Sequence, residues 1–184
     1  MKSLLSICII AVVCAVPAAW SQDKSHPPDE PGPIHKELAK RAGEYNIVSK
    51  FALKPGESPM ESTGTAKITS VVDGRFLLEE HTGMQFGKPI KGLRLHGYNN
   101  STKQYESTWT YSMATGMMLM QGTSKDNGKT IDYAASFMDA KGDKQMLYVT
   151  TRFMDDDHFT VELYAKTADG KRGPALAATY TRKK

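Results

Sequence analysis

The chain is poor in cysteine: it has 2 in 184 residues, Cys8 and Cys14, and both fall in its first segment. That segment has a positive start at Lys2, an apolar run over residues 4–16 and small residues up to Ser21. These features are typical of a secretory signal peptide, residues 1–21, that is cleaved near Ser21. We therefore expect an exported protein, periplasmic or secreted, whose mature form has no disulfide bond, no nucleophilic thiolate and no cysteine metal site.

Long apolar runs are missing after this segment. The run over residues 4–16 is itself shorter than the roughly 20 apolar residues that a membrane-spanning helix requires. No stable membrane insertion is therefore expected once the leader is removed. An uncleaved membrane anchor and a lipoprotein with its lipid on Cys14 are the alternatives, although Val13 is bulkier than the residue that usually precedes a lipid-bearing cysteine.

Charge of one sign is not in large excess, and catalytic motifs are absent. The 24 basic and 20 acidic residues give a formal net charge of +4, and the longest basic run is Arg182–Lys184, so a nucleic-acid partner is not expected. The sequence has no Gly-x-Ser-x-Gly elbow, no His-Glu-x-x-His helix, no phosphate-binding loop and no dinucleotide fingerprint. No catalytic residue is assigned, and a non-enzymatic role is favoured.

The sequence after the leader divides into a tether, a short helix and a long series of strands. Residues 22–33 are polar and contain four prolines, which is typical of a disordered tether. Residues 34–42 have apolar residues at helical spacing and are followed by Gly43, which predicts one short helix. Over residues 44–182, turn signals of Gly, Asp, Asn and Pro separate ten stretches in which apolar and polar residues alternate. We expect residues 34–184 to form one domain.

The strand pattern predicts an all-β fold: a single antiparallel up-and-down barrel of about ten strands with the short helix at its N-terminus. The connections are short, which favours sequence neighbours as neighbours in the sheet. A two-sheet β-sandwich is the alternative. A closed sheet of this size encloses more volume than its own side chains easily fill, so a cavity is expected. By alternation, the inward face carries Ile47, Ala66, Tyr105, Trp109, Tyr111, Met113, Ile131, Tyr133, Phe159 and Val161.

Six segments carry a likeness to a known family: His35–Gly43, Pro59–Gly64, Asp73–Glu80, Gly97–Asn99, Ser107–Met118 and Tyr180–Arg182. They resemble a bacterial family of domains of unknown function, number fifteen seventy-nine, over nearly all of the sequence after the tether. The resemblance implies a distantly calycin-like barrel, of the lipocalin, fatty-acid-binding and nitrobindin types, and it brings no activity or catalytic residue with it. The family usually opens its first strand with Gly, any residue and Trp, where this chain has Gly43, Glu44 and Tyr45.

The resemblance also implies a seam between the first and last strands. In calycin-like barrels, a basic residue of the last strand packs on the aromatic ring of the opening motif. Tyr45 and Arg182 both fall on the inward face by alternation, and a guanidinium on a tyrosine ring contributes roughly 0.5 to 2 kcal/mol. A solvated Arg182 beside Lys183 is the alternative.

Glu79 and His81 are the polar candidates for the barrel interior. Their strand has two possible orientations, because Phe76 and Leu78 compete with Leu77 for the inward face. If Leu77 points inward, Glu79 and His81 do so too, and the pair is suited to acid–base chemistry or to a metal or haem site. A pair at the rim or facing solvent is the alternative.

The following strand is predicted to point its histidine outward. His96 shares a face with Arg94 and Tyr98, while Leu93 and Leu95 lie on the opposite face. Because leucine is the residue type expected inside, His96 is predicted to lie outside.

Four methionines, Met113, Met117, Met118 and Met120, are gathered around a Thr–Gly turn. Thioethers are soft ligands that suit copper(I). Methionine also fills cores and lines adaptable pockets. Met113 shares the predicted inward face of Trp109, which favours pocket lining, and no metal ligand is assigned.

Together these patterns favour a binding protein. The leading prediction is an exported barrel whose interior takes a small apolar or amphipathic molecule, because large rings with polar tips orient ligands in such cavities. A haem- or metal-binding barrel that uses His81 or the Met113–Met120 cluster, and a filled structural barrel with no ligand, are the alternatives; the cofactor and the oligomeric state are not predicted. The predicted cavity residues are Tyr105, Trp109, Tyr111, Met113, Met118, Tyr133 and Phe153.

Overall fold

The structure, a computed structural model, describes residues 29–52, 58–138, 144–166 and 172–184. The predicted signal peptide and most of the predicted tether lie outside these residues. Within the described part of the chain, no helix has the length and apolar character needed to cross a bilayer.

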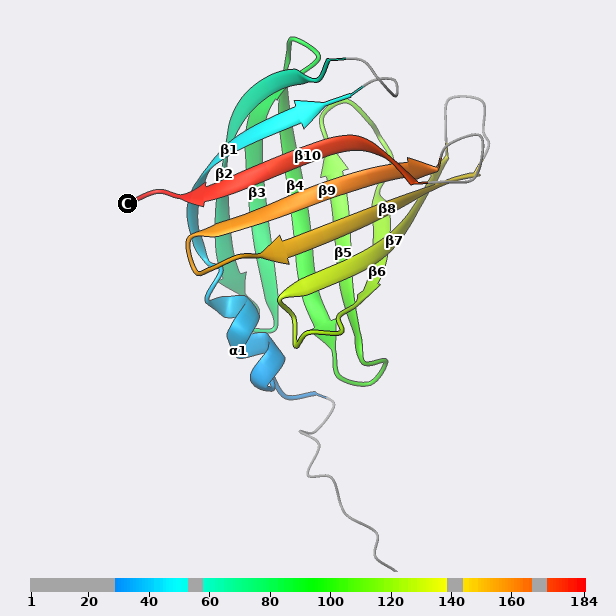
Figure 1. Cartoon of the computed structure of the whole chain (residues 1–184). Helices are drawn as coiled ribbons and strands as arrows, with labels where there is room; N and C mark the ends of the chain where they lie inside the picture. Colours follow the sequence, from blue (N-terminus) through cyan, green and yellow to red (C-terminus); the bar gives the residue numbers. More distant parts are fainter. Residues whose placement is uncertain (1–28, 53–57, 139–143, 167–171) are drawn as a thin grey trace, which may run out of the picture.

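The described residues form one short helix and ten strands that close into a barrel (Figure 1). Every strand pairs antiparallel with its neighbours in sequence, and the last strand pairs with the first. The predicted up-and-down barrel is therefore confirmed, and the β-sandwich alternative is wrong. The elements are α1 (Pro33–Ala39), β1 (Gly43–Phe51), β2 (Met60–Val71), β3 (Phe76–Gln85), β4 (Lys88–Asn99), β5 (Gln104–Tyr111), β6 (Met118–Thr123), β7 (Thr130–Met138), β8 (Lys144–Phe153), β9 (His158–Lys166) and β10 (Arg172–Arg182).

Tight turns set the register of the strands. The β3–β4 hairpin is the clearest case: Gln85 pairs with Lys88, and the two residues between them, Phe86 and Gly87, have φ of 50° and 72°. A two-residue hairpin with positive φ at both positions matches the twist of the strands it joins. Since side chains alternate along each strand, a fixed register also fixes which side chains enter the barrel.

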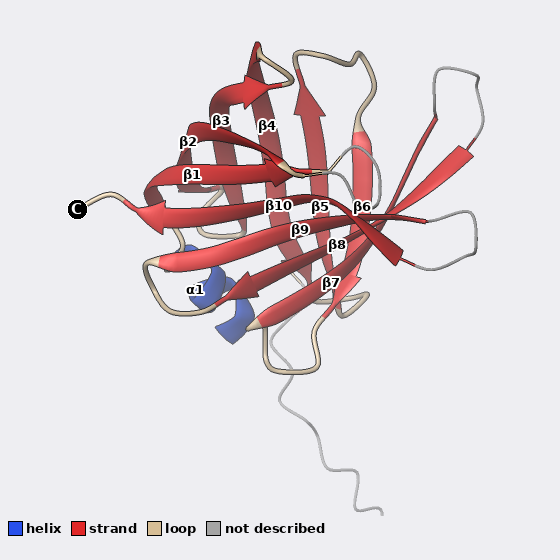
Figure 2. Ribbon diagram, turned by 45° about the horizontal axis from the view of Figure 1, so that its top comes forward, coloured by secondary structure: helices blue, strands red, loops and turns tan. Residues whose placement is uncertain are grey.

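Helix α1 lies against one end of the barrel (Figure 1) and contacts β3 and β4. His35 fixes it there, because its Nδ1 accepts a hydrogen bond from the Gly32 amide at 3.0 Å and its Nε2 donates to the Tyr98 carbonyl at 2.9 Å. Leu38 adds an apolar contact to the core. Strand ends and loops border the opposite end, which comes forward in Figure 2. We call this opposite end the mouth; Phe51, Phe86 and the 112–117 loop belong to it.

Aromatic and aliphatic side chains fill the half of the barrel next to α1. Tyr45 and Ile131 are fully buried, and the Phe159 and Tyr180 rings stack with centroids 4.2 Å apart. The Tyr45 ring meets Phe159 edge-on at 5.2 Å. Rings packed in this way contribute their buried apolar area and a further term from ring geometry. The core of the fold is therefore at the α1 end, and the space available to other molecules must be sought toward the mouth.

Candidate ligand-binding site in the barrel interior

Strand β3 places both of its polar candidates inside the barrel. Leu77 and Glu79 are each 6% exposed, whereas Phe76 and Leu78 keep part of their surface in solvent. The His81 side chain is 12% exposed on the same inward face. The alternative that places this pair at the rim or facing solvent is therefore wrong: the Glu79 carboxylate and the His81 imidazole lie inside the barrel.

A hydrogen bond from the opposite wall holds the Glu79 carboxylate. The Tyr180 hydroxyl on β10 donates to Glu79 Oε1 at 2.9 Å, across a sequence separation of 101 residues. His81 Nδ1 lies 3.9 Å from the same oxygen and is enclosed without a hydrogen-bond partner. The His81 imidazole therefore has a nitrogen without a hydrogen-bond partner, beside a carboxylate oxygen that already accepts a hydrogen bond from the Tyr180 hydroxyl.

Strand β4 has the opposite orientation to the one predicted. Leu93 and Leu95 lie on the outer surface, 48% and 38% exposed, while Arg94 and His96 are 9% and 7% exposed inside the barrel. The prediction that His96 lies outside is wrong, because the interior at this level supplies polar partners. Tyr133 from β7 gives His96 Nδ1 a hydroxyl contact at 2.8 Å.

Arg94 is a cation inside the barrel with only a neutral side chain bonded to it. Its Nε donates to Ser107 Oγ at 2.9 Å, and its Cζ lies 5.5 Å from the centroid of the Tyr133 ring. Its Nη2 is enclosed without a hydrogen-bond partner. Glu79 is its register partner on β3, yet among the residues that the structure describes no carboxylate oxygen lies within the 4.0 Å of an ion pair with Arg94.

Burial controls the protonation of the interior groups. It lowers the pKa of His81 against the opposing effect of Glu79, and it lowers the pKa of His96 well below its ordinary value, with Arg94 adding to the shift. Burial and the neighbouring carboxylate together raise the pKa of Tyr180 far above its usual range, so its hydroxyl keeps its proton. Both histidines are therefore neutral at pH 7, and Tyr180 is a donor.

Trp109 and Tyr111 line the interior on the mouth side of Arg94. Their rings stack with centroids 6.2 Å apart, and the His81 ring meets Trp109 edge-on at 5.7 Å. The indole lies directly over Gly92, where an added Cβ would come within 2.4 Å of a ring carbon. A residue without a side chain is therefore required at Gly92 for the indole to lie flat against the wall.

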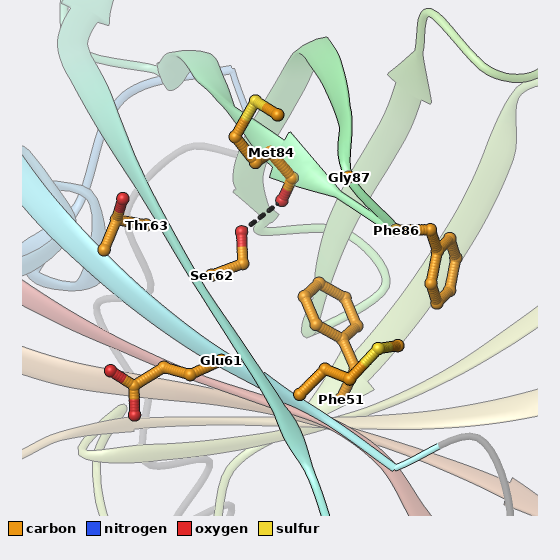
Figure 3. A pocket seen from close by; sticks show the side chains of 8 residues that line it. Phe51, Glu61, Ser62, Thr63, Met84, Phe86 and Gly87 are labelled. Atoms are coloured by element: carbon orange, nitrogen blue, oxygen red, sulfur yellow. Dashed lines mark hydrogen bonds between the residues drawn. The ribbon is translucent and has the colours of Figure 1, made fainter.

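The described structure also has a cleft at the mouth, shown in Figure 3. Its volume is about 360 Å³, and the Phe51 and Phe86 rings lie 5.5 Å apart beside it. Phe86, Met60 and Met84 are 46%, 44% and 41% exposed, so this rim presents apolar surface to solvent. Sequence reasoning missed the rim; its signal was a large apolar residue at the tip of a tight hairpin. The lining residues are Phe51, Met60, Glu61, Ser62, Thr63, Met84, Phe86 and Gly87.

The structure divides the predicted cavity residues between the two halves of the barrel. Tyr105 and Tyr133 are 3% and 2% exposed and belong to the packed core. Phe153 lies near α1, where the Arg41 guanidinium is 4.7 Å from its ring centroid. These three residues pack in or against the α1 half of the core, whereas Trp109 and Tyr111 lie on the inward face near the mouth and are partly exposed.

The methionine cluster does not share one environment. Met120 is buried in the core, and Met118 packs against that core while keeping part of its surface exposed. Met113 and Met117 lie in the loop between β5 and β6 and are 44% and 62% exposed. The prediction that Met113 shares the inward face of Trp109 is wrong, because β5 ends at Tyr111.

The first and last strands meet where the sequence placed a seam. Tyr45 and Arg182 are register partners, and the Arg182 Cζ lies 5.0 Å from the Tyr45 ring centroid. The same guanidinium donates through Nη1 to the Ala42 carbonyl at 2.6 Å and through Nη2 to the Lys40 carbonyl at 2.9 Å. Arg182 therefore joins β10 to the turn that connects α1 with β1; its contribution to stability stays a prediction.

Among the described residues, no three His, Cys, Asp or Glu side chains are grouped closely enough to hold a metal ion. The polar interior instead consists of four groups from three strands: Glu79 and His81 from β3, Arg94 from β4 and the hydroxyl of Tyr180 from β10. All four groups lie inside the barrel, on the α1 side of the Phe51 and Phe86 rings at the mouth.

Comparison with known proteins identifies the fold and a family. A family model described as "Protein of unknown function (DUF1579)" matches residues 30–182. No curated protein matches the chain. Fourteen chains of solved structures match it. One is the crystal structure of Rv2717c from M. tuberculosis, 18% identical, with a TM-score of 0.58, covering 84% of this chain and 100% of that one. Another is a redesigned β-barrel, b11L5F_LGL, 15% identical, with a TM-score of 0.40, covering 79% of this chain and 93% of that one.

Proposed function

The chain belongs to the DUF1579 family, a family of calycin-like barrels of unknown function, and from the geometry of this member we propose that it is a binding protein. Its ligand is a small apolar or amphipathic molecule that enters the mouth half of the barrel. The proposal includes export: a leader that ends near Ser21, a tether that follows it, and a binding domain that begins with α1, one residue earlier than the predicted start at residue 34.

The observation that carries the proposal is partial exposure of inward-facing side chains. Trp109, Tyr111 and Met118 point into the barrel from β5 and β6, and each keeps part of its surface accessible. The same holds for His81, at 12% exposure. Since these side chains face away from the outer surface of the sheet, the mouth is the proposed route to them. Partly exposed aromatic and apolar walls above a few polar groups are typical of ligand sites.

The apolar rim supports the same conclusion. Phe86 and Met84 hold exposed apolar surface at the hairpin tip, and Phe51 continues that surface toward the interior. A contiguous apolar surface at the entrance of a barrel is suited to the passage of an apolar molecule. The filled α1 half limits how far such a molecule can enter, which favours a ligand smaller than the full length of the barrel.

Titration with a neutral apolar fluorescent probe, N-phenylnaphthylamine, tests the proposal. Met118 and Leu119 are adjacent on β6, but Met118 lies inside the barrel and Leu119 is 63% exposed outside. Met118→Trp should fill the mouth half and weaken probe binding at least about tenfold, while Leu119→Trp should leave it unchanged. Equal binding by the two variants, or no binding by the unmodified protein, would contradict the proposal.

The haem and copper alternatives have their own tests. A haem protein that uses His81 would show a Soret band that His81→Ala abolishes; a protein that takes up no haem on titration would contradict this alternative. Copper(I) held by the methionines would bind more weakly after Met117→Leu and Met118→Leu. Unchanged copper affinity in that double variant would exclude the thioether site.

A further inference from the structure

We propose that Arg94 binds the carboxylate of an amphipathic ligand, whose apolar part extends from Arg94 toward the mouth. This inference rests on the proposed function and deepens it by naming the class of ligand. It assigns a polar end to the bottom of the site and an apolar end to the aromatic walls and the rim.

The first argument is the state of the Arg94 side chain. The guanidinium is held inside the sheet at 9% exposure, and Ser107, a neutral residue, takes its Nε hydrogen. The enclosed Nη2 has no acceptor. Among the described residues no carboxylate forms an ion pair with this buried cation, which is costly, and a charged donor without an acceptor adds to that cost. An arginine fork matches a carboxylate with two parallel hydrogen bonds, so a carboxylate is the acceptor that compensates both costs.

The second argument is the order of side chains along the barrel. Glu79, Arg94 and Trp109 are register partners across β3, β4 and β5, and the next inward-facing pair toward the mouth is His81 with Gly92. A ligand oxygen at Arg94 therefore lies beside Trp109 and below the His81 ring, whose Nδ1 has no hydrogen-bond partner. The imidazole is placed to donate a second hydrogen bond to the same ligand.

The side chains between Arg94 and the mouth suit the apolar part of such a ligand. From Arg94 to Ile90, near the mouth, β4 rises about 13 Å at roughly 3.3 Å per residue. Gly92 lies between them on the inward face, with the Trp109 indole over it. The walls on this path are the partly exposed Trp109, Tyr111 and Met118. In the proposed complex, the apolar part of the ligand contacts these walls and ends at the apolar rim.

Glu79 gives the proposal a specific consequence. Its carboxylate is the register partner of Arg94 and accepts the Tyr180 hydroxyl, so its negative charge opposes a ligand carboxylate nearby. Glu79→Gln keeps an acceptor for Tyr180 and removes that charge. The substitution should therefore tighten carboxylate binding and leave the binding of a neutral ligand nearly unchanged.

Competition between dodecanoate and dodecanol tests the proposal, with displacement of N-phenylnaphthylamine from the purified protein as the readout. Dodecanoate should bind about tenfold or more tightly than dodecanol, the factor expected for a hydrogen bond to a charged group. Arg94→Gln should abolish this preference. Arg152→Gln, an exposed arginine on the outer face of β8, is the matched control and should retain it. Circular dichroism and thermal unfolding of each variant report whether it is folded.

The outcomes separate the two proposals. Equal affinity for dodecanoate and dodecanol, or a preference that survives Arg94→Gln, overturns the carboxylate site and leaves the proposed function standing. Failure of the unmodified protein to bind the probe or either competitor overturns the proposed function itself. If Arg94→Gln does not fold, Glu79→Gln decides the matter: tighter dodecanoate binding supports the site, and weaker or unchanged binding overturns it.

Discussion

Replacement of Arg182 by alanine should destabilise the barrel by about 2 to 4 kcal/mol. The Arg182 guanidinium lies 5.0 Å from the Tyr45 ring centroid, and at 23% side-chain exposure this contact is worth about 1 kcal/mol. Its bonds to the Ala42 and Lys40 carbonyls, 2.6 and 2.9 Å long, are charged hydrogen bonds, and solvent screening reduces each to about 1 kcal/mol. The ion pair with Asp157 at 3.1 Å adds less than about 1 kcal/mol, because Asp157 is half exposed.

Chemical and thermal denaturation give this free energy directly. A loss of this size corresponds to a fall in Tm of about 4 °C or more for a chain of this length. Lys183→Ala is the matched control: Lys183 is adjacent, and its ion pair with Glu44, at 3.4 Å, is exposed, so the loss should stay below about 0.5 kcal/mol.

A double-mutant cycle separates the ring contact from the hydrogen bonds. Arg182→Ala and Tyr45→Leu should show a coupling energy of about 0.5 to 2 kcal/mol. Refutation is straightforward: if Arg182→Ala and Lys183→Ala cost the same, or the cycle gives no coupling, Arg182 behaves as a solvated terminal arginine and the seam contributes nothing.

Three further predictions follow from the interior. Burial lowers the pKa of His96, so below about pH 6.5 the unfolded chain binds a proton at this residue that the folded barrel does not bind. The free energy of unfolding should therefore decrease as the pH is lowered, by up to about 1.4 kcal/mol per pH unit. In urea titrations between pH 5 and 7, His96→Gln should show a smaller decrease. Gly92→Ala should cost about 1 to 3 kcal/mol and shift the Trp109 emission maximum, because its Cβ would enter the indole ring, whereas Gly116→Ala meets nothing within 4 Å and should be neutral; equal effects would contradict the packing. Tyr180→Phe should cost about 1 to 3 kcal/mol by removing the donor of a buried carboxylate, and an unchanged free energy of unfolding would show that water replaces that donor.

Alternation along the strands was sufficient to predict most of the barrel. Tyr45 and Ile47 on β1, and Phe159 and Val161 on β9, are buried as their positions in the pattern require. The turn signals cut the chain into ten strands in the right order. These features can be predicted locally, because a strand with one solvent-exposed face and one buried face must alternate polar and apolar residues.

The orientation of β4 was not predictable from that rule. Leu93 and Leu95 lie outside and Arg94 and His96 inside, the reverse of a hydrophobic-in pattern. The hydrogen-bond partners that allow these polar side chains to lie inside, such as the Tyr133 hydroxyl on β7, are distant in sequence, so no local pattern predicts them. In β3, Phe76, Leu77 and Leu78 made either orientation possible until the register with β4 was known. Polar interiors of this kind occur where function needs them, and local rules are expected to fail there.

The candidate site was half predictable. Trp109 and Tyr111 follow from clean alternation in β5, which places them inside near the mouth. Arg94 was assigned to the wrong side together with His96, because nothing local pairs it with an interior partner. Phe86 was not singled out, since a hairpin tip has no inward face by which alternation could place it.

The most direct test of the central claim is native mass spectrometry of the protein purified from its native host, followed by extraction and identification of any bound molecule. We expect a one-to-one complex with an apolar or amphipathic molecule, lost in Met118→Trp and retained in Leu119→Trp. Protein that carries nothing, binds no N-phenylnaphthylamine and shows no change in Trp109 emission with apolar probes would contradict the claim and leave a filled structural barrel.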